Sequence, residues 1–320
     1  MSKNILKKIL NLDLLSVVLA TVVLAVALAT TAKGFLTTTS TLSILSTGAV
    51  YAMVGIAQLL VLAVGQFNLA LGAIACCSAM GSMAFMQATG MPMVVTLLVG
   101  LLIGTLLGGI QGLLAAKSGI NPFVITLAMN SVYYGLATAV FRSSVFNQVP
   151  AEFKAISTNN VGGIPVVFFI AVGIAILIWL LLQKTYMGRR LLAAGASLSA
   201  AVIAGINTKN QIWVAHTLSG LIAAIAGLLI TAKLGAAQLS IGTGWMTMSF
   251  ATAVLGGTLM SGGKVGVTGT IIGAVLFSMI KSGLTLWGVS FYWTDTFMGL
   301  LLIVAFEFDR VRKRRGIKVG

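Results

Sequence analysis

The stretch KTYMGRRLLAAGASLSAAVIAGINTK, from Lys184 to Lys209, divides the chain into two long hydrophobic halves. It carries four basic residues and no acidic residue, and alanine and glycine fill many of the positions between them. Alanine favours a helix, and small residues leave the surface of that helix smooth. We therefore predict a short helix with cationic ends that serves as a docking surface rather than as a spacer.

The composition around this stretch is that of an integral membrane protein. Of the 320 residues, 58% are hydrophobic and 8% are charged, and the mean hydropathy is +1.07, whereas an ordinary soluble domain is about 25% charged. The apolar residues run continuously instead of alternating, so the spans are helices, which satisfy their own backbone groups in lipid. The sequence predicts an all-α polytopic membrane protein with one transmembrane domain over residues 1–320.

Ten apolar segments approach the length of roughly 20 residues that a helix needs to cross a bilayer. The first is too long for a signal-peptide core, so we predict that it is retained. For the third and the eighth segments a full span and a broken or re-entrant helix both stay open, because Asn68 begins the third and glycines crowd the end of the eighth. The segments cover residues 14–32, 42–63, 68–87, 92–116, 122–141, 164–183, 210–232, 246–262, 264–281 and 294–309.

The basic residues predict the orientation of the chain. With ten spans, both termini and the 184–209 loop lie on one side, which collects most of the 20 lysines and arginines. By the positive-inside rule this side is cytoplasmic. Because the net charge of +15 is dispersed over short loops, we expect no nucleic acid as a partner. The other side holds only Lys33, Arg142, Lys154, Lys233 and Lys281, and its longest connection, 142–163, is where an extracytoplasmic partner is expected.

Two glycine patterns bear on how the helices pack. In the fourth span glycine recurs every four residues from Gly100 to Gly112, which predicts a ridge for close helix packing and a central position for this span. Residues 104–108 read GTLLG, and residues 269–273 in the ninth span read GTIIG. Because an offset of five spans reverses the orientation, spans 2–5 and 7–10 are predicted to form an inverted repeat with a solute path near the midplane.

The chain lacks the residues for chemistry of its own. Its five carboxylates, one histidine and adjacent cysteines, Cys76 and Cys77, form neither a metal cluster nor a paired nucleophile, so we expect no catalysis, metal or cofactor. We expect His216 to be a hydrogen-bonded packing residue. The glycine-rich run 255–269 departs from the Walker A pattern at two positions, so it predicts a tight turn rather than an ATP site. Energy for uphill transport must therefore come from a separate chain.

Neutral hydrogen-bonding residues remain as candidates for the solute path. Such a lining suits an uncharged, polyhydroxylated solute better than an ion or a peptide. The same residue types also join membrane helices through hydrogen bonds, so a structural role stays open for each of them. The candidates are Gln58, Gln66, Asn68, Asn130, Tyr134 and Trp245.

Two segments of the chain resemble a known family. Residues 185–207, TYMGRRLLAAGASLSAAVIAGIN, follow its pattern T-x-x-G-r-x-x-x-A-x-G-x-N-x-x-A-A-x-x-x-G-I-n, and residues 255–273, LGGTLMSGGKVGVTGTIIG, are similar to its LGGTSLSGGxGxxxGTxxGA block. These are patterns of permease subunits of ribose-type sugar ABC importers, a binding-protein-dependent transport family of the inner membrane. The resemblance extends over nearly the whole chain. In two places the chain departs from it: Asn68 stands where the family usually has Asp, and residues 246–251 lack an acidic residue.

The resemblance implies a permease domain over residues 1–320, a transport subunit and not an enzyme, that moves a small neutral solute such as a monosaccharide or polyol by ATP-driven alternating access. It implies separate ABC ATPase subunits that bind the ATP, a periplasmic or lipid-anchored solute-binding protein, and a homodimer or a heterodimer with a related permease in the lipid of the bacterial cytoplasmic membrane. A branched-chain amino acid ABC permease and a self-sufficient carrier or channel stay open as alternatives. In the 184–209 loop the ATPase-docking role falls on Gly188, Arg189, Ala194, Gly195, Ala200, Ala201, Gly205 and Ile206.

Overall fold

The computed structural model describes residues 3–142 and 144–290, and beyond them residues 293, 296, 297, 299, 300 and 303. From residue 3 to residue 290 the described chain forms twelve helices, α1 to α12, and a two-stranded antiparallel hairpin, β1–β2. Eight of these helices are long and apolar enough to cross a membrane. The prediction of an all-helical polytopic membrane protein is confirmed.

The long helices coincide with eight of the predicted spans to within a few residues, apart from α1, which begins well before the predicted start. Predicted span ten, residues 294–309, lies almost entirely outside the described residues. The long helices are α1 (Lys3–Thr31), α2 (Thr38–Leu62), α3 (Leu71–Thr89), α4 (Met93–Lys117), α5 (Pro122–Phe141), α7 (Val166–Lys184), α10 (Thr208–Leu234) and α12 (Val267–Leu286). The shorter elements are α6 (Ala151–Thr158), β1 (Asn160–Val161), β2 (Ile164–Pro165), α8 (Tyr186–Ala196), α9 (Leu198–Ile203) and α11 (Trp245–Leu255).

Several helix ends carry capping residues. The side chain of Asn121 accepts a hydrogen bond from the backbone N–H of Phe123 at 2.9 Å, and Pro122 begins α5. A proline at this position costs no hydrogen bond, because the first N–H groups of a helix have no partner within it. Helices α3 and α10 end at Gly90 and Gly235, whose φ angles of 66° and 67° favour glycine.

The sequence left open whether the third and eighth segments are full spans or broken helices, and the structure differs between the two. The third is a complete helix, α3, which begins only at Leu71, after the non-helical stretch 63–70. The eighth is interrupted: α11 has 11 residues, which rise about 16 Å, whereas the bilayer core is about 30 Å thick. Non-helical backbone precedes both helices, at 63–70 and at 235–244.

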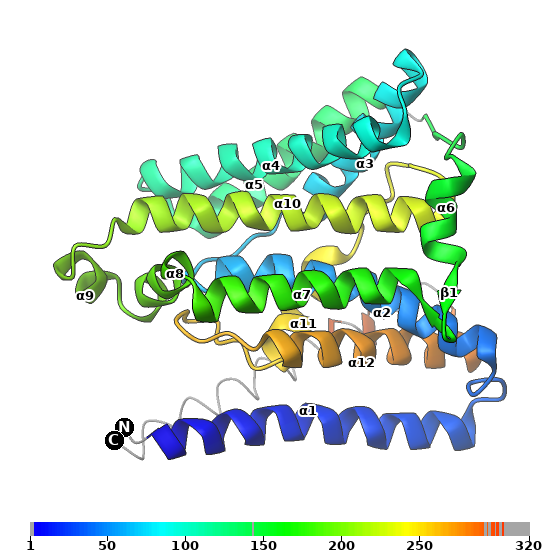
Figure 1. The fold of residues 1–320 in the computed structure, drawn as a ribbon, viewed down its shortest axis with the longest axis horizontal. Helices are drawn as coiled ribbons and strands as arrows, with labels where there is room; N and C mark the ends of the chain where they lie inside the picture. The colour runs from blue at the N-terminus through cyan, green and yellow to red at the C-terminus, as the bar shows by residue number, and fades with distance from the viewer. Residues whose placement is uncertain are drawn as a thin grey trace.

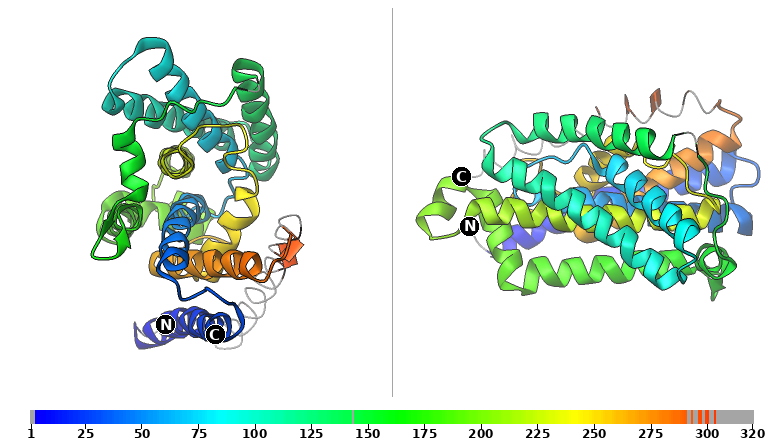
Figure 2. Two further views of the ribbon diagram at one scale, coloured as in Figure 1. Left: turned by 90° about the vertical axis from the view of Figure 1, so that its right-hand side faces the viewer. Right: turned by 90° about the horizontal axis from the view of Figure 1, so that it is seen from above.

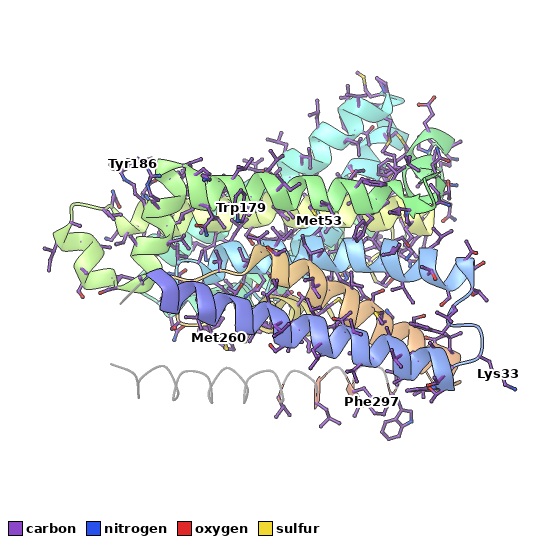
Figure 3. All side chains as sticks on the ribbon, turned by 60° about the horizontal axis from the view of Figure 1, so that its bottom comes forward. Lys33, Met53, Trp179, Tyr186, Met260 and Phe297 are labelled. Atoms are coloured by element: carbon purple, nitrogen blue, oxygen red, sulfur yellow. The ribbon has the colours of Figure 1, made fainter. Side chains whose placement is uncertain are left out.

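The helices run along the long axis of the molecule, which has two distinct ends (Figure 1). One end carries α8 and α9, and the other carries α6 and the β1–β2 hairpin. Helix α1 begins at the end that carries α8 and α9. In Figure 3, Tyr186 of α8 lies at this end, and Lys33, which follows α1, lies at the other end. This arrangement places the start of α1 and the 184–209 loop together, as the sequence predicts.

Helix α2 lies at the centre of the structure. Every residue from Gly48 to Leu62 is buried, and α2 packs against α7, α10, α11 and α12. Seen from the α6 end, α2 lies between α10, α11 and α12 (Figure 2). Predicted span four, α4, is not central: its outer face is exposed, with Leu98, Leu102 and Leu106 each more than half accessible. The glycine ridge therefore holds α4 to the bundle from the outside.

The ridge of α4 packs directly on α10. A Cβ atom added at Gly104 would lie 2.4 Å from Cβ of Ala224, and one at Gly108 would lie 2.5 Å from the carbonyl oxygen of His216. Gly220 of α10 faces them and has no room for a side chain either. Apolar lipid gives helices no hydrophobic reason to associate, so this close approach of two backbones is what joins α4 to α10.

We expect Gly108→Leu to destabilise the protein. The added side chain forces α4 away from α10, and overpacking of this kind costs about 1–3 kcal/mol of unfolding free energy. Thermal unfolding of the detergent-purified protein measures the effect. Gly173→Leu in α7 is the control, because no atom lies within 4 Å of a Cβ at Gly173. Equal stability of the two variants would contradict the close packing of α4 on α10 at Gly108.

Candidate functional site

The 184–209 loop folds into α8 and α9, each capped by its own preceding residue. The Thr185 hydroxyl accepts from the N–H of Gly188 at 3.1 Å, and the Ser197 hydroxyl accepts from the N–H of Ala200 at 3.3 Å. Asn207 caps α10 in the same way, through the N–H of Asn210 at 3.1 Å. Three hydroxyl or amide caps in succession thus break this stretch into two short helices before α10 begins.

Two glycines hold α8 against the rest of the molecule. A Cβ at Gly188 would lie 2.1 Å from the carbonyl oxygen of Leu181, so α8 folds back tightly on the end of α7. A Cβ at Gly195 would lie 1.9 Å from the carbonyl oxygen of Ala63, at the end of α2, and 2.8 Å from the nitrogen of Gly263. Both glycines are therefore packing positions that no other residue can occupy without a shift of backbone.

Three separate segments meet at Gly195. Gly263, in the connection between α11 and α12, donates its N–H to the carbonyl oxygen of Ala63 at 3.1 Å. A Cβ at Gly262 would lie 2.7 Å from the oxygen of Gly195 and 2.7 Å from the nitrogen of Gly65. We call the meeting of residues 63–65, 195–196 and 261–263 the glycine junction. It connects the 184–209 loop by direct backbone contact to central helix α2 and to the α11–α12 connection.

The outer face of the loop is apolar and lies mainly on α9. Leu198, Val202 and Ile203 are 55%, 57% and 88% exposed at the end of the molecule. Beside them on α8, Arg190 donates to the Tyr186 hydroxyl at 2.7 Å and lies 4.1 Å from the centroid of its ring. Exposed aliphatic side chains that lie together make this face a candidate surface for a protein or a membrane.

The eight predicted docking residues divide between the two faces of the loop. Arg189, Ala200 and Gly205 are exposed. Gly188, Ala194 and Ala201 are buried, and Gly195 and Ile206 are half-buried. Sequence reasoning missed the exposed aliphatic residues Leu198, Val202 and Ile203, although their spacing after the capping residue Ser197 is a helical signal for them.

Two candidates for the solute path belong to a buried hydrogen-bond network. Gln111 of α4 donates from Nε2 to Oδ1 of Asn68 at 2.9 Å and contacts Nδ1 of His216 at 3.1 Å. Nε2 of His216 contacts Oε1 of Gln66 at 3.1 Å, and Asn68 donates to the Ser219 hydroxyl at 3.1 Å. A neutral imidazole with its proton on Nε2 satisfies both contacts of His216. The prediction that His216 is a hydrogen-bonded packing residue is confirmed.

This network joins the 63–70 stretch to α4 and α10. Asn68 Oδ1 also accepts from the N–H of Ala70 at 3.0 Å, which fixes the backbone just before α3. Asn68, Gln111, His216 and Ser219 are fully inaccessible. Among these four described side chains, only Oε1 of Gln111 lacks a partner. Buried polar groups that are bonded to one another in this way favour a single arrangement of the helices around them.

The other four candidates lie apart from the network. Gln58 in α2 is fully buried, and neither atom of its amide group has a hydrogen-bond partner. Tyr134 of α5 donates its hydroxyl to the carbonyl oxygen of Ile241 at 3.2 Å. Trp245, the first residue of α11, is buried in the core, and Asn130 of α5 is half-buried. The structure thus brings together Gln66 and Asn68 and leaves the rest dispersed.

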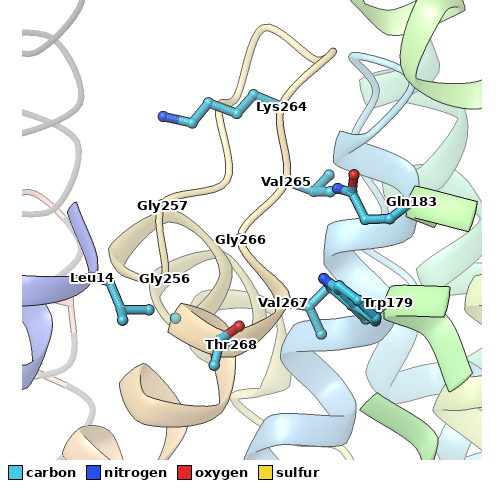
Figure 4. Close-up of a pocket in the computed structure, with 11 residues that line it drawn as sticks. Leu14, Trp179, Gln183, Gly256, Gly257, Lys264, Val265, Gly266, Val267 and Thr268 are labelled. Carbon is cyan, nitrogen blue, oxygen red and sulfur yellow. The ribbon is translucent and has the colours of Figure 1, made fainter. Parts of the chain in front are cut away.

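A small cavity of about 100 Å³ lies between α1, α7 and the α11–α12 connection (Figure 4). Lys264 extends along its edge, and Trp179 of α7 and Leu14 of α1 lie on opposite sides. Burial lowers the pKa of Lys264. Sites for drug-sized ligands occupy about 300–1,000 Å³, so this cavity is smaller than an ordinary ligand site.

The glycines of the α11–α12 connection form the tight turn predicted for them. Gly257, Gly262 and Gly263 have φ angles of 90°, 88° and 78°. The Thr258 hydroxyl accepts from the N–H of Gly266 at 3.1 Å and closes the turn.

Comparison with known proteins matches residues 40–306 to the family described as branched-chain amino acid transport system / permease component. The ribose import permease protein RbsC of Bacillus subtilis is 33% identical over 278 residues, 86% of each chain. The D-allose transport system permease protein AlsC of Escherichia coli K12 is 30% identical, over 87% of this chain and 85% of AlsC. The fructose import permease protein FrcC of Rhizobium meliloti is 30% identical, over 88% of this chain and 80% of FrcC. No solved structure matches the chain.

Proposed function

The chain belongs to the permease-component family of the branched-chain amino acid transport system, and on this premise we propose that it carries a small sugar across the bacterial cytoplasmic membrane. It is the permease subunit of an ABC importer and holds no catalytic domain. ATP is hydrolysed by partner ATPase subunits, and a solute-binding protein delivers the sugar. The proposal includes a second permease copy, identical or related, beside this chain.

The observation that carries the sugar assignment is the extent of the matches to sugar permeases. Relatives named for ribose, allose and fructose match this chain at 30–33% identity, over at least 80% of this chain and of each relative. The family description names branched-chain amino acids, which keeps that solute class as the second candidate. Neutral amides and hydroxyls in the buried regions suit a sugar, whereas the α-ammonium group of an amino acid calls for a carboxylate.

An inverted repeat of spans 2–5 and 7–10 is supported by matched packing. Helix α10 packs on α4 through Gly220, and α2 packs on α12 through Gly55, where an added Cβ would lie 2.7 Å from the Thr270 side chain. The same number of residues separates Gly55 from Gly220 as separates Gly104 from Gly269. The members of each pair, α2 and α10 or α4 and α12, run in opposite directions.

The α8–α9 end is the proposed ATPase-binding surface. The outer apolar face of α9 supplies the contact, and the predicted docking residues Gly188, Ala194 and Ala201 support it from beneath. This assignment places both termini and the 184–209 loop in the cytoplasm. The α6 end and the 142–163 connection then face the solute-binding protein.

The glycine junction is the proposed route of coupling. When the ATPases close, α8 and α9 move with them, and the backbone contacts at Gly195 displace the end of α2 and the α11–α12 connection together. Such rigid-body movement opens one side of the midplane and closes the other, which is alternating access. Gln58, Gln66, Asn68, Asn130, Tyr134 and Trp245 remain proposed path residues.

We expect ATP-dependent uptake of a sugar by the complete importer in proteoliposomes. The assay compares labelled D-ribose, D-allose and D-fructose with L-leucine, in the presence of the ATPase and the solute-binding protein. Uptake of L-leucine and of none of the sugars would instead support a branched-chain amino acid as the solute. Uptake by the permease chain without ATPase would overturn the importer mechanism.

We expect Ile203→Asp to weaken ATPase binding about 30-fold, because an apolar anchor at an interface is worth about 2 kcal/mol. The side chain is 88% exposed, so folding should be unaffected. Binding is measured by titrating ATPase against the detergent-purified permease. Val161→Asp is the matched control, since it adds the same charge to a 60% exposed aliphatic residue at the opposite end. An equal effect of both variants would refute the docking surface.

A further inference from the structure

Gln58 is anomalous among the buried side chains of the described residues. It is fully inaccessible, and both its Nε2 and its Oε1 lack a hydrogen-bond partner. Other buried amides in the described chain, such as Asn68 and Gln111, have bonded donors. A desolvated amide without partners opposes folding, so a purely structural role would favour leucine at this position.

The position of Gln58 on α2 points to a solute. At 100° per residue, Thr47, Tyr51 and Gln58 fall within a stripe about 40° wide. Lys233 of α10 donates to the Thr47 hydroxyl, and Tyr51 packs with Met248 of α11. Nζ of Lys281 in α12 lies 5.9 Å from the centroid of the Tyr51 ring. The stripe therefore faces α10, α11 and α12, and it places polar groups from the α6 end of α2 down to Gln58.

The membrane segment beside this stripe is discontinuous. Helix α11 is interrupted, with the non-helical stretch 235–244 before it. Discontinuous helices of this kind form solute sites near the membrane midplane. The α11–α12 connection also meets α2 at the glycine junction, so a movement of the 184–209 loop changes the packing of α11 against α2.

The chemistry of the amide selects the ligand class. A glutamine side chain offers two donor hydrogens and one acceptor oxygen, which match adjacent hydroxyl groups of a polyhydroxylated solute. Lys233 puts a positive charge at the α6 end of the stripe, which disfavours a cationic solute.

We propose that Gln58 is the solute-recognition residue of the path, and that its amide binds hydroxyl groups of a neutral sugar between α2, α10 and α11 when these helices separate. This inference rests on the proposed function. In the conformation described here the site is closed, and the amide is sealed inside the bundle.

The first test is the accessibility of a cysteine at position 58 in the complete importer. Cys76 and Cys77 are replaced by alanine, and Gln58→Cys is treated with a membrane-permeant thiol reagent. We expect slow labelling at rest, at least tenfold faster labelling during ATP turnover, and protection by the transported sugar. Ala57→Cys is the control, because Ala57 is equally buried but lies about 100° away on the helix. Equal labelling of both cysteines, or none at position 58 during turnover, would overturn the proposal.

The second test separates recognition from structure with Gln58→Leu. We expect its melting temperature to equal or exceed that of the wild type, since an unpaired amide is removed, while sugar uptake falls about tenfold or more. Gln111→Leu should lower the melting temperature, because it breaks the contacts of Gln111 with Asn68 and His216. If Gln58→Leu takes up sugar at the wild-type rate, the role of Gln58 is refuted and the proposed function stands. If the wild-type importer takes up no sugar, the proposed function itself is refuted.

Discussion

The structure depends on the close approach of helix backbones at glycine. In lipid, where apolar side chains gain nothing by leaving the solvent, such contacts must supply the association that burial supplies in soluble proteins. They occur where α4 meets α10, and where Gly269 of α12 lies so near α11 that a Cβ would be 2.0 Å from the oxygen of Gly256. Gly55 of α2 instead makes room for the side chains of Thr252 in α11 and Thr270 in α12. Each contact tolerates no side chain, so helix positions are sharply defined.

The same kind of contact connects the 184–209 loop to the interior. At the glycine junction Gly195 meets Ala63 and Gly263 without an intervening side chain, so little movement can be absorbed between them. On the proposed mechanism, a displacement of α8 reaches α2, the most buried helix, and the connection between α11 and α12. The buried network around His216 holds the other side of the 63–70 stretch to α4 and α10. On the same proposal, movement is directed toward α11, the short helix that packs against α2.

Much of the fold follows from composition and helix period. The predicted span 122–141 has the bounds of α5, and 92–116 differs from α4 by one residue at each end. The sequence could not reveal that α2 rather than α4 is central, because a glycine ridge reports one packed face and says nothing about the other. It also could not supply the partners of His216, since Gln66 and Gln111 lie far away in the chain. In the 184–209 loop the docking residues came from a resemblance, which does not specify which side of α9 faces outward.

The central proposal is that Gly195, to which the resemblance gives an ATPase-docking role, instead transmits movement of the 184–209 loop to α2 and does not itself bind the ATPase. The most direct measurement is the number of sugar molecules taken up per ATP hydrolysed by the importer that carries Gly195→Ala. The account predicts that the ATPase still binds with wild-type affinity and hydrolyses ATP, while uptake per ATP falls about tenfold, because the added methyl separates the three segments of the junction. Unchanged uptake per ATP, or loss of ATPase binding, would contradict it.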